Sequence, residues 1–140
     1  MKQVLQENKI NIRLKISFLW MGMMMLYIYN DFFHLFPPDS LQKIMDGNMG
    51  PLTISQLNLF MAALLMAIPV ILSVVTLYFS SKTIRVINIV FGVLYTFVNI
   101  GNIIGETWIF YIFLGIIQVG ITLAIVGSSL KWPKMKLSSY

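Results

Sequence analysis

The chain has 140 residues, of which 58% are hydrophobic and 11% charged, with a formal net charge of +5. A soluble domain carries about 25% charged residues, and so apolar a chain would expose aggregating patches in water. The composition excludes an ordinary soluble domain and predicts a single membrane domain over residues 1–140. Because the chain has no cysteine, disulfides, thiolate metal sites and cysteine nucleophiles are excluded as well.

Four segments have the length and apolar character of membrane-crossing helices, for which about 20 apolar residues are needed. They cover about residues 12–35, 56–79, 84–104 and 108–130. The first apolar run has no small-residue cleavage site and continues beyond signal-peptide length, so we expect it to be a retained helix. The fold class is therefore all-α, an integral membrane four-helix bundle.

The first helix begins with Arg13 and Lys15, which we expect to reach out to the membrane surface. It ends at Pro37-Pro38, and the link over residues 37–55 is the only long one. Asp39 or Ser40 can cap a short helix there, which we expect to lie in the membrane interface.

The second helix has Ser55 as a candidate N-cap and contains Pro69, which predicts a kink. The links before and after the third helix are short, so the helices that they join are predicted to be antiparallel neighbours. Trp20 and Trp108 lie near predicted interfaces, although Trp20 is deeper than an interfacial tryptophan should be.

Basic residues are distributed unequally between the two predicted membrane sides. One side holds Lys43 alone, and the other holds nine: Lys2, Lys9, Arg13, Lys15, Lys82, Arg85, Lys131, Lys134 and Lys136. Loops rich in lysine and arginine stay in the cytoplasm, so both termini are predicted to be cytoplasmic and the 37–55 link extracytoplasmic. The same rule explains the basic charge without nucleic acid, which we exclude as a partner.

Polar and small side chains recur at helical spacing in every predicted span. The longest such face, in the third span, comprises Asn88, Gly92, Tyr95, Asn99, Asn102 and Glu106. The matching faces are Ala62, Pro69, Ser73 and Thr76 in the second span, Tyr111, Gly115, Gln118 and Thr122 in the fourth, and Tyr27, Asp31 and His34 in the first. These faces must point into the bundle, either as hydrogen-bonding contacts or as the lining of a cavity. Gly101 and Gly105 suggest a close helix contact on an adjacent face.

The candidate site lies at the extracytoplasmic end of the bundle. Asp31, His34 and Glu106 are predicted to line its mouth, with Asn99 and Asn102 beneath. Carboxylates and an imidazole at one mouth can pass protons, bind a cation or hold a lipid headgroup. The alternative is that these residues only mark where helices reach water, with His34 favourably placed at a helix C-terminus. No spacing motif assigns a metal, and no cofactor is indicated.

Three stretches carry a family resemblance: "LWMGMMMLYIYNDFFHLFPP", "RVINIVFGVLYT" and a last helix ending in "KWPK". Together they resemble a family of small four-helix bacterial membrane proteins of unknown function, over about residues 14–133. The most specific element is Tyr29 followed by Asp31. The resemblance implies a helical protein of the bacterial cytoplasmic membrane and no particular activity. The layout is also loosely similar to that of DoxX-like proteins.

Three functions are compatible with these features. The leading hypothesis is a membrane protein that binds or conducts a small ligand, lipid or ion through its semi-polar interior. An alternative is a membrane-embedded enzyme on a lipidic substrate, with His34 and either Asp31 or Glu106 as acid and base. A third is a structural subunit of a larger complex. The expected partners are the bilayer, a lipid or small molecule and, by self-association, a second copy of the chain.

Overall fold

The computed structural model describes residues 9–134, and most of them form four long helices. These are α1 (Ile12–Phe33), α3 (Gln56–Tyr78), α4 (Ser81–Ile103) and α5 (Ile109–Leu130), each of 22 or 23 residues. At 1.5 Å per residue each is about 33–35 Å long, enough for a hydrocarbon core of about 30 Å. All four are long and apolar enough to cross a membrane. The predicted helical fold with four candidate spans is confirmed.

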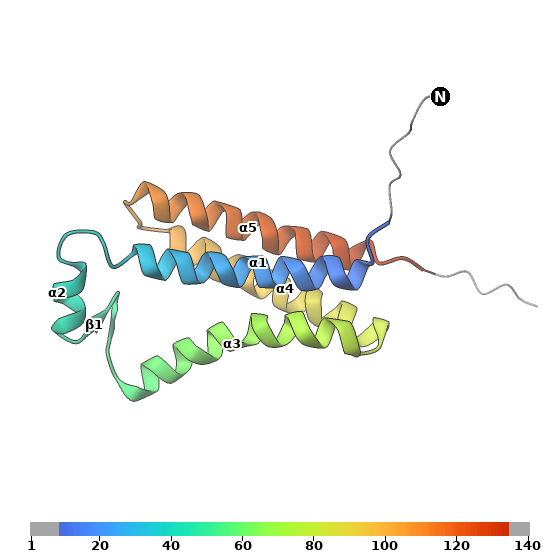
Figure 1. The fold of residues 1–140 in the computed structure, drawn as a ribbon, viewed down its shortest axis with the longest axis horizontal. Helices are drawn as coiled ribbons and strands as arrows, with labels where there is room; N and C mark the ends of the chain where they lie inside the picture. Colours follow the sequence, from blue (N-terminus) through green and yellow to red (C-terminus); the bar gives the residue numbers. More distant parts are fainter. Residues whose placement is uncertain (1–8, 135–140) are drawn as a thin grey trace, which may run out of the picture.

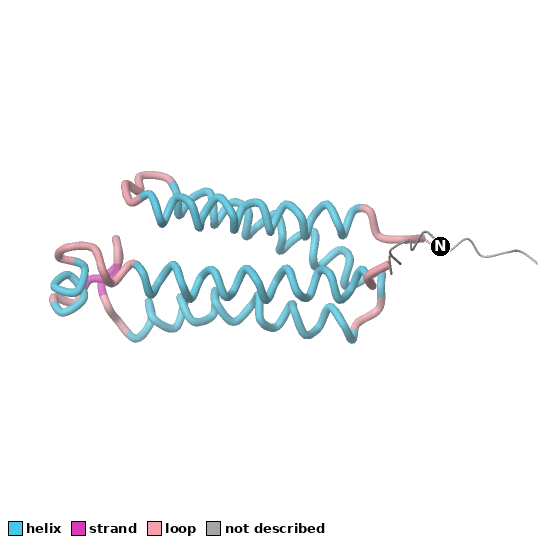
Figure 2. Tube along the Cα trace, turned by 45° about the horizontal axis from the view of Figure 1, so that its top comes forward, coloured by secondary structure: helices cyan, strands magenta, loops and turns pink. Residues whose placement is uncertain are grey.

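The long helices form two stacked pairs, α1 with α3 and α4 with α5, held together mainly by the packing of α1 on α5 (Figures 1 and 2). The link between α3 and α4 is short, because α3 ends at Tyr78 and α4 begins at Ser81. These two helices nevertheless contact each other sparsely, since α3 diverges toward its N-terminal end (Figure 1). The predicted neighbouring arrangement of α3 and α4 therefore holds only in part.

The long link leaves the bundle at its left end in Figure 1, which we call the loop end. It contains α2 (Ser40–Met45) and a small antiparallel hairpin, β1 (Asn48–Met49) with β2 (Leu52–Thr53). Asp39 precedes α2 at φ 66°, and its side chain makes no capping hydrogen bond. The sequence gives no sign of the hairpin, because two-residue strands are too short to show alternation.

Two arginines at the opposite end of the bundle bind the carbonyl groups that helix C-termini leave free. The Arg13 guanidinium donates from Nη1 to the carbonyl oxygen of Phe79, at 2.6 Å, and from Nη2 to Ser81 Oγ, at 2.9 Å. Arg85 Nε donates to the carbonyl oxygen of Ser129, at 3.0 Å, near the end of α5. The prediction that Arg13 extends to the membrane surface is therefore incomplete, because its head caps α3.

Close contact between α4 and α5 depends on Gly92 and Gly115. A Cβ atom at Gly92 would lie 2.7 Å from Val126 Cγ2, and one at Gly115 would lie 2.6 Å from Ile103 Cγ1. The predicted contact through Gly101 and Gly105 is wrong. Gly101 has no such neighbour within 4 Å, and Gly105 lies beyond α4 at φ +83°, a conformation that glycine adopts readily.

The centre of the bundle is both aromatic and polar. Trp20 is fully buried, and its indole Nε1 donates to Asn88 Oδ1 at 2.6 Å, linking α1 with α4. The indole also packs edge-on against the Tyr95 ring, with centroids 5.7 Å apart. Trp20 is therefore a core residue, which explains its depth. The Tyr95 hydroxyl donates to the carbonyl oxygen of Leu65 at 2.5 Å.

Candidate functional site

His34 and Tyr111 come together at the loop end. His34 is the C-cap of α1, and Tyr111 lies in the first turn of α5. Their rings meet edge to face, with centroids 5.5 Å apart and planes inclined by 63°. The short α4–α5 turn allows this, because it returns the chain at the level where α1 ends. This contact joins the first and last spans of the bundle.

Both predicted carboxylates lie close to this pair. Glu106 Oε1 accepts hydrogen bonds from the backbone N–H groups of Thr107, at 2.8 Å, and Trp108, at 3.1 Å. Asp31 and Glu106 are each near enough to Tyr111 for a Coulombic interaction, and Asp31 also interacts with His34 in this way. Asp31, His34 and Glu106 thus lie at the same end of the bundle, and Asp31 itself is exposed.

Two buried atoms in this region have no hydrogen-bond partner among the described residues, Asn30 Oδ1 and His34 Nδ1. The Asn30 side chain is only 3% exposed. The two residues are four positions apart in sequence, so they share one face of α1 at its end. An unpaired polar atom in a buried site costs about 1–3 kcal/mol, which a water molecule or a ligand group would recover.

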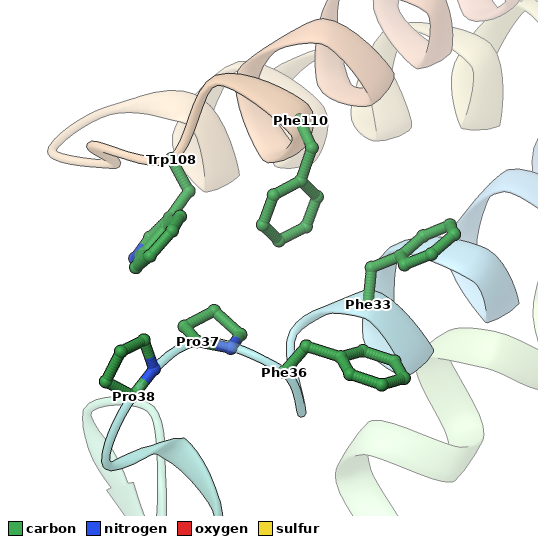
Figure 3. Close-up of a pocket in the computed structure, with 6 residues that line it drawn as sticks. All are labelled: Phe33, Phe36, Pro37, Pro38, Trp108 and Phe110. Carbon is green, nitrogen blue, oxygen red and sulfur yellow. The ribbon is translucent and has the colours of Figure 1, made fainter.

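An aromatic groove of about 340 Å³ lies at the same end of the bundle, and we call it the loop-end groove. Its lining residues are Phe33, Phe36, Pro37, Pro38, Trp108 and Phe110. Figure 3 shows the side chains of Trp108 and Phe110 extending from the start of α5 toward the Pro37-Pro38 segment, with Phe33 and Phe36 on one side. The groove and the His34–Tyr111 pair therefore lie at the same junction of α1 and α5.

The two amides expected beneath the mouth have different environments. Asn99 is fully buried, and its Oδ1 accepts a hydrogen bond from the Tyr27 hydroxyl. It belongs to the core contact between α1 and α4. Asn102 is exposed. Neither amide therefore joins the group around Tyr111 in the way that the sequence suggested.

The enzyme hypothesis requires a hydrogen bond between His34 and either Asp31 or Glu106. His34 Nδ1 has no partner, so within residues 9–134 it is not hydrogen-bonded to Asp31 or Glu106. In the same part of the chain, no three His, Asp or Glu side chains are grouped closely enough to hold a metal ion. Among the described residues, His34 thus lacks the acid–base partner that the enzyme hypothesis assigned to it.

Asn30 and the groove aromatics were missed as site residues. Because 3.6 residues make one turn, Tyr27–Asn30–His34 fits a single helical face as well as Tyr27–Asp31–His34 does. Spacing alone cannot choose between Asn30 and Asp31, and packing buries Asn30. The aromatics lie on two segments about 70 residues apart, so only the fold brings them together.

The fold and the site together define a small helical protein with four candidate membrane spans and one aromatic, polar junction at its loop end. The chain belongs to a family of unknown function, DUF6326, whose model matches residues 2–139. A search of the curated proteins and one of the solved structures each found no match. The looser similarity to DoxX-like proteins has no support from these comparisons.

Proposed function

We propose that this is a multi-pass protein of the bacterial cytoplasmic membrane, with both termini in the cytoplasm and the loop end outside. The support is the charge distribution, since nine of the ten basic residues lie on the side of the termini. The capping roles of Arg13 and Arg85 also keep two of these charges at that membrane surface.

The absence of cysteine gives a direct test of this orientation. We expect the variant Gln42→Cys, in the exposed α2, to react with a membrane-impermeant maleimide on intact cells. Lys82→Cys, exposed at the start of α4, should react only after the cells are lysed. The reverse labelling pattern would show that the loop end faces the cytoplasm.

We further infer that the protein binds a small ligand at the loop end. The observation that carries this inference is the loop-end groove, which is walled by four aromatic side chains and two prolines at the junction of α1 and α5. A volume of about 340 Å³ falls within the usual range of small-molecule sites, about 300–1,000 Å³. An apolar lining with a few polar groups beside it is also typical of such sites. The ligand is held by contacts with the aromatic side chains.

Benzyl alcohol is a suitable first probe, because it combines one ring with one hydroxyl donor. The protein, labelled with 5-fluorotryptophan and placed in lipid nanodiscs, has three ¹⁹F signals, from Trp20, Trp108 and Trp132. We expect benzyl alcohol to shift the Trp108 signal saturably and to leave the signal of the buried Trp20 unchanged, because only Trp108 lines the groove.

Two phenylalanines of α5 provide matched variants for this experiment. Phe110→Leu should weaken benzyl alcohol binding about fivefold, since one aromatic contact contributes about 0.5–1.5 kcal/mol. Phe113→Leu should leave binding unchanged, because Phe113 is 61% exposed and does not line the groove. A shift that grows linearly in all three proteins would reflect partition into lipid and would contradict the proposed site.

A further inference from the structure

We propose that the loop-end groove selects an organic ammonium ion, a proposal that rests on the ligand-binding function inferred above. The first argument is the geometry of the aromatic lining. Phe33 and Phe110 have ring centroids 6.2 Å apart with planes inclined by 62°, and Trp108 and Phe110 are 6.3 Å apart at 49°. Phe33 and Phe36 are 6.3 Å apart at 45°. Because each pair is in contact and none is stacked flat, the rings form one continuous aromatic wall whose surfaces point in several directions along the groove.

The second argument is charge. The loop end holds one basic residue, Lys43, against four carboxylates, Asp31, Asp39, Asp46 and Glu106. Glu106 is held beside the groove, because its Oε1 binds the backbone N–H of Trp108, one of the lining residues. Such a surface attracts cations and repels phosphates and carboxylates.

Aromatic rings combined with a nearby carboxylate select one kind of cation. The negative face of an aromatic ring attracts an ammonium group within about 6 Å, by about 0.5–2 kcal/mol depending on desolvation. A small inorganic cation requires several oxygen ligands in place of its hydration shell, and the aromatic and pyrrolidine side chains that line the groove supply none. An N-methylated ammonium is weakly hydrated and fits apolar walls.

The N-methylated ammonium group occurs both in soluble amines and in zwitterionic lipids. A titration with a charged probe and a neutral probe of the same shape measures how much the charge contributes to binding. The probes are choline and its neutral isostere 3,3-dimethylbutan-1-ol, added to the fluorotryptophan-labelled protein in phosphatidylglycerol nanodiscs. We expect choline to shift the Trp108 signal with about tenfold higher affinity than the alcohol. Nanodiscs that also contain phosphatidylcholine should weaken choline binding if lipid heads occupy the groove, and should leave it unchanged if the ligand is a soluble amine.

Glu106→Gln tests the carboxylate, because glutamine keeps an oxygen that accepts the two backbone N–H bonds. It should weaken choline binding several-fold and leave binding of the neutral alcohol unchanged. Asp46→Asn removes the same charge at the C-terminal end of α2, away from the lining residues, and should weaken choline binding much less than Glu106→Gln does. Equal affinities for choline and the alcohol would overturn the ammonium proposal and leave ligand binding intact. If benzyl alcohol also failed to bind, the result would contradict the proposed binding of a small ligand at the loop end.

Discussion

Replacing Asn88 by leucine should lower the free energy of unfolding by about 3 kcal/mol. The Asn88 amide accepts from Trp20 Nε1 at 2.6 Å, donates to Thr76 Oγ1 at 3.1 Å and donates to the carbonyl oxygen of Ile84 at 2.9 Å. Each such bond contributes about 0.6–1.7 kcal/mol in a membrane protein, and the substitution also leaves the Trp20 N–H buried without a partner. Leucine is similar in size to asparagine, so lost hydrogen bonding accounts for most of the effect.

Asn102→Leu is the matched control for this experiment. Asn102 lies on the same helix but is exposed, so its replacement should change stability by less than about 0.5 kcal/mol. Reversible denaturation of both variants in mixed detergent micelles, followed by circular dichroism, measures the difference. Equal stability of the Asn88 and Asn102 variants would mean that the contact between α1, α3 and α4 does not hold the bundle together.

Replacing Tyr95 by phenylalanine should cost about 2 kcal/mol, and that cost should depend on Pro69. Proline has no N–H, so Pro69 cannot bind the carbonyl of Leu65 one turn before it in α3. The Tyr95 hydroxyl of α4 donates to the Leu65 carbonyl oxygen instead, at 2.5 Å. Removing the hydroxyl leaves the Leu65 carbonyl without a hydrogen bond. In the hydrocarbon core of a membrane, where no water can replace that bond, an unpaired backbone group costs up to several kcal/mol.

A double-mutant cycle tests this coupling. In a Pro69→Ala background, the new N–H at position 69 can bind the Leu65 carbonyl, so Tyr95→Phe should then cost less than about 0.5 kcal/mol. The same denaturation measurement applies to all four proteins of the cycle. Identical costs in the two backgrounds would show that the hydroxyl does not compensate for the proline.

The sequence was sufficient for the long helices and for most of their inward faces. Asn88, Gly92, Tyr95 and Asn99 recur at helical spacing, and all four are buried as this pattern requires. The pattern fails at its end, because α4 stops at Ile103 and leaves Asn102 exposed and Glu106 in the turn. Helical periodicity therefore predicts the buried face correctly within the helix but does not predict where the helix ends.

The site was harder to predict for a different physical reason. The lining of the groove depends on how the rings of α1 and α5 pack across the bundle. Pairing between distant segments leaves no periodic signal in a single sequence. The same reason explains why the capping roles of Arg13 and Arg85 were not foreseen, since each binds carbonyl groups at least 44 residues away.

Those two arginines also bear on how the chain is assembled as it leaves the ribosome. Arg13 links α1 to the end of α3, and Arg85 links α4 to the end of α5. Each pair of helices is therefore joined by its own arginine–carbonyl hydrogen bonds. Arg13 and Phe79, which form the hydrogen bond between α1 and the end of α3, are both synthesised before most of α4 exists. The first pair can therefore close in the bilayer while the second is still being made, and the order of translation matches the order in which these bonds can form.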